Sequence, residues 1–278
     1  RKASGQAVLA VLVVGIFFTI LTMGLSSKVP VWMQVDPSIQ KLASSYFLIL
    51  YAPMLFRTAN IIFGTVLRAV GDTKTPMQVG IAFNVINIVL NFFLIYSTRS
   101  VLIGGKELLV PGAGWGVQGA AAASAIAYTI GGIAITYKLW KHTEISPKGQ
   151  SLRPDLAVLC PCLKVAVPNM FQRFATSLGY VVFASMINSL GETATAAHTI
   201  ANTVESAFYI PGWGMQTAAA TLAGNALGAN DNKKLSGLAR AIMPLEIGLM
   251  VVSGGLLFIF APVLIRLFSS DDQIISLG

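Results

Sequence analysis

A glutamate lies near the middle of one of the longest apolar segments of this chain. Glu205 falls within residues 193–227, a stretch that contains no Lys or Arg. About 20 helical residues cross the ~30 Å hydrocarbon layer of a bilayer, so a helix over this stretch would hold the carboxylate at membrane depth. An ionised carboxylate is costly there unless it meets water, a partner or a proton. This residue is therefore the first candidate for binding a cation or exchanging a proton.

Three other polar residues share the helical face of this acid. A period of 3.6 residues brings His198, Asn202, Glu205 and Tyr209 onto one stripe, which we expect to face away from lipid. Pro211 follows and should kink the helix and loosen its carbonyls. A polar stripe with an acid beside a helix break predicts a site that binds a substrate or a cation.

Two arginines also fall inside apolar segments. Arg173 shares a helical stripe with other polar residues and has Gln172 beside it, while Arg57 lies shortly after Pro53. A guanidinium stays charged even when it is buried, so Arg173, Gln172 and Arg57 join the candidate binding residues. The alternative is that Glu205 pairs with one of these arginines to hold helices together. The sequence leaves both readings open.

Other polar features of the apolar segments have simpler explanations. Asn84, Asn87 and Asn91 share one helical face, where amides commonly join neighbouring membrane helices. Glu246 is a second acid, but it lies nearer the end of its segment. The glycines of residues 112–119 superficially make a phosphate loop. Because we expect no strand before them and an Ala-rich span follows, close helix packing is the better prediction.

The composition indicates a polytopic membrane protein. Hydrophobic residues make up 55% of the 278 residues and charged residues only 11%, with a mean hydropathy of +0.72, far from the balance of a soluble domain. The net charge of +8 is spread over short segments, without the basic face that nucleic-acid binding needs. The only cysteines, Cys160 and Cys162, are too few for a zinc site or a disulfide framework. We expect free thiols, no cofactor and no nucleic-acid partner.

Seven apolar segments could each span a bilayer. They lie at about 7–33, 42–67, 76–97, 113–137, 156–190, 193–227 and 238–268. The connections are short and carry Gly, Pro, Asn and Asp. Only residues 139–154 resemble an exposed linker, which would separate an N-terminal lobe, 1–138, from a C-terminal lobe, 155–278. The sequence thus predicts an all-α polytopic membrane protein.

The distribution of basic residues predicts an orientation. Most of the 19 Lys and Arg residues fall on the side of the predicted spans that carries residues 139–154, and the positive-inside rule makes that side cytoplasmic. We therefore expect a multi-pass protein of the inner (plasma) membrane with a cytoplasmic linker. The chain starts at Arg1 without a signal-peptide pattern, and we expect further sequence before it.

An internal repeat predicts two related lobes. Residues 1–31 align without a gap with residues 233–263. The residues identical in the two copies are Lys2, Ser4, Gly5, Ala7, Leu25, Pro30 and Val31. The repeat predicts two bundles of six spans, with two spans before Arg1 and three after Gly278. Because an even number of spans separates the copies, they would be parallel repeats about an axis normal to the membrane, with the substrate bound between the lobes.

The most distinctive pieces of the sequence are Arg-Ala-Val-Gly-Asp-Thr-Lys-Thr-Pro at 68–76 and Leu-Gly-Ala-Asn-Asp at 227–231. Together with residues 51–60, 84–91 and 114–123 they resemble helices four to six and the end of helix eight of multidrug and toxic compound extrusion (MATE) transporters. The resemblance covers nearly the whole chain, as helices three to nine and the edge of ten. It implies a two-lobe fold of six plus six helices, and export of amphipathic, often cationic compounds in exchange for Na⁺ or H⁺.

The coupling residues of the resembled family cannot be carried over to this chain. Family members often place coupling carboxylates in the first, seventh or tenth helix, and the seventh-like segment here has no acid beyond its terminal Asp155. We expect a monomeric antiporter for drug-like small molecules, with the lipid bilayer as its other partner. A lipid-linked oligosaccharide flippase of similar build is the alternative, favoured if the cavity between the lobes is strongly basic. A membrane-embedded enzyme is more remote, since the sequence lacks a Ser/His/Asp set, a metal-ligand cluster and an HExxH pattern.

Overall fold

The computed structural model of the chain divides into two compact units, residues 1–160 and 161–278. It describes residues 1–32, 37–103, 106–268 and 271–277. Residues 139–154, expected as a linker between lobes, lie within the first unit.

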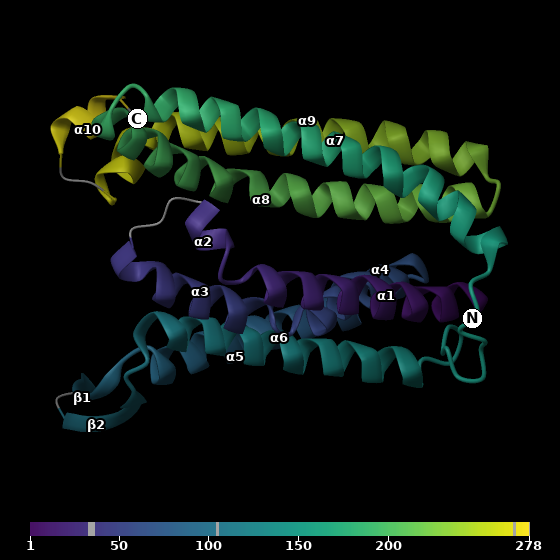
Figure 1. The fold of residues 1–278 in the computed structure, drawn as a ribbon. Helices are drawn as coiled ribbons and strands as arrows, with labels where there is room; N and C mark the ends of the chain where they lie inside the picture. The colour runs from purple at the N-terminus through teal and green to yellow at the C-terminus, as the bar shows by residue number, and fades with distance from the viewer. Residues whose placement is uncertain (33–36, 104–105, 269–270, 278) are drawn as a thin grey trace. The chain divides into compact units, whose positions relative to one another are not determined.

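The described residues form helices and one β-hairpin (Figure 1). The helices are α1 Lys2–Leu25, α2 Val29–Trp32, α3 Pro37–Tyr51, α4 Met54–Ala69, α5 Lys74–Leu94, α6 Gly116–Lys141, α7 Leu156–Asn188, α8 Glu192–Gly228, α9 Asn232–Arg266 and α10 Asp272–Leu277. The strands are β1 Ser97–Ile103 and β2 Lys106–Ala113. This order of elements confirms the predicted helical fold class and adds a hairpin to it.

Proline accounts for the break between α3 and α4, which the sequence predicted as a single span over residues 42–67. The two helices differ in direction by 42°, and Pro53 is the residue that precedes α4. A proline has no N–H to donate to the preceding turn, and its ring clashes with the carbonyl four residues earlier. Helix α3 therefore ends at Tyr51, and the pair can serve as one bent span.

The turn between α4 and α5 ends one helix and caps the next. Gly71 takes a left-handed backbone with φ of +87°. The N–H groups of Gly71 and Asp72 donate to the carbonyls of Arg68 and Leu67, which is the Schellman ending of a helix. Oδ1 of Asp72 then accepts the backbone N–H of Thr75 at 3.0 Å, as an N-terminal capping residue does.

The turn between α8 and α9 uses the same device. Asn230 has φ of +54°, and the N–H groups of Asn230 and Asp231 donate to the carbonyls of Leu227 and Ala226. Oδ1 of Asp231 accepts the backbone N–H of Lys234 at 2.9 Å. The two most distinctive pieces of the sequence thus have one local explanation, a left-handed residue followed by an aspartate cap.

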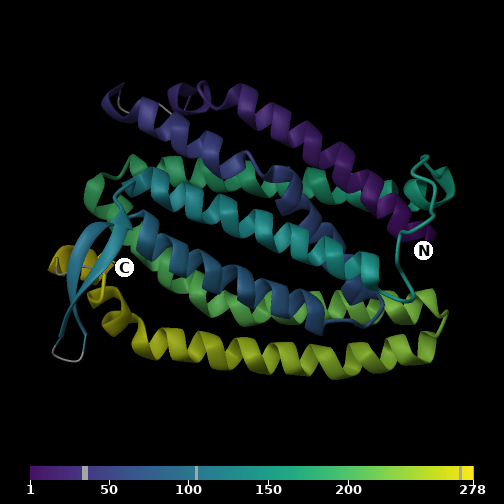
Figure 2. The same cartoon turned by 90° about the horizontal axis from the view of Figure 1, so that it is seen from below.

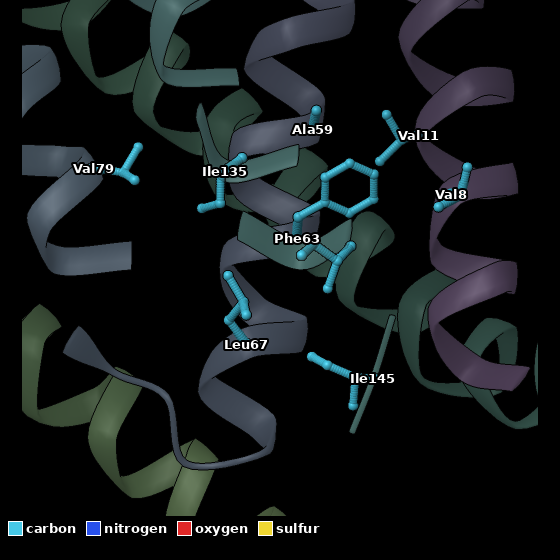
Figure 3. Packing of buried hydrophobic residues seen from close by; sticks show 9 residues of the cluster. Val8, Val11, Ala59, Phe63, Leu67, Val79, Ile135 and Ile145 are labelled. Carbon is cyan, nitrogen blue, oxygen red and sulfur yellow. The ribbon is translucent and has the colours of Figure 1, made fainter. Parts of the chain in front are cut away.

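The core of the first unit lies between α1, α4 and α6. Phe63 of α4 is 2% exposed, and its ring lies among side chains of α1 and α6 (Figure 3). Ile145, from the segment that follows α6, joins the same cluster. The buried members are Val8, Val11, Ala59, Phe63, Leu67, Val79, Ile135, Leu139 and Ile145.

Glycines let helices of the first unit approach closely. A Cβ built on Gly132 of α6 would lie 2.6 Å from both Cβ and O of Phe56 on α4. A Cβ on Gly119 would collide with the backbone of Leu94 at the end of α5. Small residues permit such approaches in membrane bundles, so the packing role predicted for residues 112–119 is confirmed at Gly119.

A β-hairpin that the sequence analysis did not predict joins α5 to α6. Its strands are antiparallel, with Ser100 opposite Leu109, and it extends beyond the ends of α5 and α6 in both views (Figure 1, Figure 2). The expectation that no strand precedes residues 112–119 is wrong. However, this is a two-stranded hairpin and not the parallel βαβ unit of a nucleotide site, so the phosphate loop stays excluded. The sequence signal is the Gly104-Gly105 pair between two apolar runs.

The segment after α6 is anchored to the start of α1. Nε2 of Gln6 donates to the carbonyl of Arg153 at 2.8 Å, and its Oε1 accepts the N–H of Asp155 at 3.0 Å. Ile145 is 7% exposed. A buried glutamine and an apolar side chain therefore hold the segment 139–154 against the helices at these contacts. Its role as a linker between two lobes stays a prediction.

Within the described residues, four helices are long and apolar enough to cross a membrane, namely α1, α5, α6 and α9, and the bent pair α3 and α4 makes a fifth if the pair is one span. Large apolar side chains point outward from them, such as Ile88 at 67% and Phe258 at 86% exposed, as a surface that meets lipid requires. Helices α7 and α8 are long enough, with 33 and 37 residues, but are less apolar and do not meet the same test. Their membrane crossing stays a prediction.

The two segments of the sequence repeat are both helical, but α1 begins at Lys2 whereas α9 begins at Asn232, two residues before the Lys234 that aligns with Lys2. They differ at their far ends. Helix α1 stops at Leu25, whereas α9 continues through Pro262 to Arg266. The rotation that would relate the two copies stays a prediction.

Candidate functional site

Glu205 lies on the side of α8 that borders α9. It is exposed and lines a cavity of about 330 Å³. The other lining residues are Phe208, Tyr209, Met250, Ser253, Gly254 and Leu257. Oγ of the buried Ser253 donates to the carbonyl of Phe208 at 2.7 Å and so ties α9 to α8. Glu205 and Tyr209 thus share one site, whose walls are otherwise mostly apolar.

The other two residues of the predicted stripe meet α7 instead. Nδ2 of Asn202 donates to Oη of Tyr180 at 2.6 Å. The ring of His198 packs edge-on against Phe183, with 5.4 Å between centroids, and its buried Nε2 has no hydrogen-bond partner among the described residues. Since a helix rises 1.5 Å per residue, His198 and Tyr209 lie about 16 Å apart along the axis. The structure does not bring the whole stripe to one place.

Glu246 of α9 lies beside Gly212 of α8, a helix that runs continuously through the Pro211 expected to kink it. A Cβ built on Gly212 would be 3.4 Å from Oε1 of Glu246 and 3.0 Å from Cε of Met250. Met250 also lines the Glu205 cavity, so both carboxylates border the contact between α8 and α9. Glu246 is half-buried whereas Glu205 is exposed. Glu246 was the second membrane acid to be predicted, because it lies nearer the end of its apolar segment. The sequence did not indicate that Gly212, after Pro211, makes room for its carboxylate beside α8.

A second cavity lies between α7 and α8 and has a volume of about 570 Å³. Its lining residues are Asn169, Gln172, Arg173, Thr176, Trp213 and Gln216. Two predicted candidates, Gln172 and Arg173, therefore share a site, and Trp213 and Gln216 are additions. In the described part of the second unit, Arg173 and Glu205 line different cavities and form no ion pair. The alternative that these two neutralise each other is not what the structure shows.

Arg57 has a partner inside the first unit. Its Cζ lies 5.0 Å from the ring centroid of Tyr128 on α6. A cation–π contact of this kind stabilises a guanidinium without a carboxylate. Arg57 therefore has a local structural explanation, and its pairing with Glu205 stays a prediction.

The three asparagines of α5 make helix contacts. Nδ2 of Asn87 donates to Oγ of Ser124 on α6 at 3.1 Å, and Nδ2 of Asn91 donates to Oδ1 of Asn87 at 3.0 Å. Asn84 bonds to the carbonyl of Gly80 in its own helix. The predicted interhelical hydrogen bonding is confirmed at Asn87.

These features define a helical integral membrane protein that carries carboxylates and a guanidinium on long, proline-containing helices. The MatE family model matches residues 1–93 and 168–278. The chain belongs to the MatE family.

Curated relatives extend over most of the chain. The probable multidrug resistance protein NorM of Thermotoga maritima is 28% identical over 278 residues, which are 100% of this chain and 58% of the relative. The probable multidrug resistance protein YoeA of Bacillus subtilis is 26% identical, over 87% of this chain and 50% of the relative. Multidrug and toxin extrusion protein 2 of Mus musculus is 24% identical, over 88% and 40%. The chain spans about half the length of these relatives.

Solved structures share the fold. A MOP superfamily transporter from Pyrococcus furiosus matches with a TM-score of 0.85 at 22% identity, over 99% of this chain and 59% of that one. A multidrug resistance MATE family transporter in an outward-facing conformation matches with a TM-score of 0.83 at 21% identity, over 99% and 59%. The chain has the fold of MATE transporters. The two structures are named as transporters and the relatives as multidrug resistance or extrusion proteins, and none of these names supports the flippase alternative.

Proposed function

We propose that the full-length protein is a secondary active antiporter that exports amphipathic or cationic small molecules in exchange for Na⁺ or H⁺. The observation that carries the proposal is the pair of carboxylates, Glu205 and Glu246, along the α8–α9 contact of a MatE family chain. Relatives named as multidrug resistance proteins support drug-like substrates. In this proposal the protein acts as a monomer in the inner membrane, has residues 139–154 in the cytoplasm, and uses no cofactor besides the coupling ion.

The coupling ion acts through the charge of these acids. An ionised carboxylate is costly in apolar surroundings, and a bound proton or Na⁺ removes most of that cost. Glu205 is open to its cavity and can exchange an ion, while Glu246 packs beside Gly212. Because Pro211 interrupts the hydrogen bonding of α8 there, a bend of α8 would change the surroundings of both carboxylates together.

Exchange requires that the ion bind differently in the two states of the transporter. A ligand with equal affinity for both states shifts nothing, however tightly it binds. Occupied carboxylates would favour one state and empty carboxylates the other. Substrate and ion would then compete for the protein by favouring opposite states.

Replacing each acid by its amide tests this proposal. Glu205→Gln and Glu246→Gln keep the side-chain shape and remove the exchangeable charge. In proteoliposomes of the full-length protein, we expect Glu205→Gln to abolish uptake of ethidium driven by a Na⁺ or proton gradient, and Glu246→Gln to reduce it. The matched control is Glu144→Gln, which removes an exposed acid outside the helices. Unchanged ethidium uptake in both test variants, with normal protein levels, would contradict the proposal.

A further inference from the structure

We propose that the cavity between α7 and α8 binds an anionic group, a carboxylate in the simplest case, carried by an amphipathic molecule. The inference rests on the proposed transport function and adds to its cationic substrates a class of amphipathic molecules that carry an anionic group. It also separates the two ligands, since the substrate's anionic group and the coupling ion would occupy different cavities of the second unit.

Arg173 is the one charged residue among the described residues that line this cavity. It lies about halfway along α7, at the depth of the bilayer if α7 spans it. Within the part of the chain that the structure describes, no hydrogen bond, ion pair or ring contact joins its side chain to another residue. An arginine is always charged, and a charge at membrane depth needs water or an opposite charge. Among the described residues this positive charge therefore has no partner, and it lines a cavity.

The rest of the lining supplies hydrogen-bond donors and no carboxylate. Gln172 and Gln216 carry side-chain amides, and Trp213 carries an indole N–H, and none of these groups has a side-chain hydrogen bond within the described residues. Asn169 and Thr176 differ, because each donates to a carbonyl of its own helix, at 2.8 Å and 2.9 Å. Charge-assisted hydrogen bonds from a guanidinium and neutral donors suit a carboxylate or phosphate. A cationic group would be repelled here.

The size and the aromatic wall indicate an amphipathic ligand. A volume of about 570 Å³ is large enough for a drug-sized molecule. The indole of Trp213 offers an apolar face next to its N–H donor. The Glu205 cavity provides the contrast, since it has an acid and no arginine among its lining residues.

Binding of three matched probes tests the inference. The probes share a naphthalene ring and differ in charge: 2-naphthaleneacetate is anionic, 2-naphthaleneethanol is neutral and 2-(2-naphthyl)ethylammonium is cationic. For the full-length protein in an uncharged detergent, equilibrium dialysis should show the acetate bound about tenfold or more tightly than the alcohol, and the ammonium most weakly. Arg173→Gln should remove the preference, and Arg173→Lys should retain part of it.

A control variant and a second test variant distinguish loss of the anion site from a general effect of charge or folding. Lys164→Gln removes a positive charge from the same helix outside the cavity and should keep the preference. Gln216→Glu adds a negative charge to the cavity while leaving Arg173 in place, and should abolish binding of the acetate even if Arg173→Gln does not fold. Equal affinities for the three probes, or a preference that survives Arg173→Gln, would overturn the inference.

Lipid vesicles separate the two sources of an anionic group. If phosphatidylglycerol displaces the acetate and phosphatidylcholine does not, the cavity binds anions and a lipid headgroup competes for it. If neither lipid displaces the acetate, the cavity binds anions of free molecules only. Either result supports an anion site. Because dialysis needs no gradient, it tests the anion site separately from transport. If the acetate is preferred through Arg173 but no cation gradient drives transport, only the antiport proposal is contradicted. If transport needs Glu205 but the acetate is not preferred, only the anion site is contradicted.

Discussion

Asp72 shows how one side chain couples protonation to the packing of the first unit. Partial burial raises the pKa of this carboxyl, but hydrogen bonds from the hydroxyl and the backbone N–H of Thr75, with the nearby charges of His142 and Lys138, hold the pKa below its usual value. A carboxyl whose pKa is lower in the folded state than in the unfolded state stabilises the fold at pH values above its unfolded pKa. That stability is lost as the pH falls through the folded pKa.

We therefore predict that thermal stability in detergent falls as the pH drops below about 4, the ordinary range of an aspartate. Asp72→Asn should lower stability at pH 7 by about 1 kcal/mol, because it weakens the cap and removes the charge. It should also flatten the acid part of the profile. A variant with the wild-type melting temperature at pH 7 and the wild-type acid profile would contradict this role.

The sequence could identify site residues only where the pattern lies within a single helix. The helical period placed Glu205 and Tyr209 together correctly, because it needs only the geometry of one helix. The partners of His198 and Asn202 depend on α7, which no period reveals. The same is true of Trp213 in the Arg173 cavity, because it comes from a different helix.

At the scale of elements, Gly132 marks a close contact between α4 and α6 in the first unit. We predict that Gly132→Ala destabilises the protein by about 1–3 kcal/mol, because the new Cβ meets the backbone and Cβ of Phe56 at 2.6 Å. Thermal unfolding of the purified protein measures the change.

The matched control for that contact is Gly80→Ala in α5, where a Cβ would meet nothing within 4 Å. Alanine should raise stability there by up to about 1 kcal/mol, since it replaces a helical glycine. If the two substitutions changed thermal stability equally, Gly132 would not be needed for close packing between α4 and α6.

The order of helices was largely predictable from apolar length, but their interruptions were only partly so. The capped turns after α4 and α8 follow from Gly71 and Asn230, which a sequence displays directly. The break at Pro53 was missed because the apolar run continues through it. The hairpin before α6 was missed because its two short strands fall between the predicted spans 76–97 and 113–137.

At the scale of the whole molecule, the orientation in the membrane follows from charge and can be measured at the start of α7. Cys160 and Cys162 are exposed free thiols. We predict that a membrane-impermeant maleimide labels them in inside-out vesicles and not in intact cells, because the basic side that includes residues 139–154 is expected to be cytoplasmic.

A thiol on the opposite side of the membrane is the control for this labelling. Ser100→Cys, made together with Cys160→Ser and Cys162→Ser, places a single thiol at an exposed position of β1. We expect it to be labelled in intact cells. Labelling of Cys160 or Cys162 from outside would invert the orientation.

The antiport mechanism is tested most directly by ion flux that the substrate itself drives. Because coupling is reciprocal, an ethidium gradient across proteoliposomes of the full-length protein should drive Na⁺ or protons uphill in the opposite direction, and Glu205→Gln should abolish this flux. A pH-sensitive dye and ²²Na⁺ report the two ions. Ethidium movement that carries neither ion against its gradient, at any substrate gradient, would contradict the antiport mechanism.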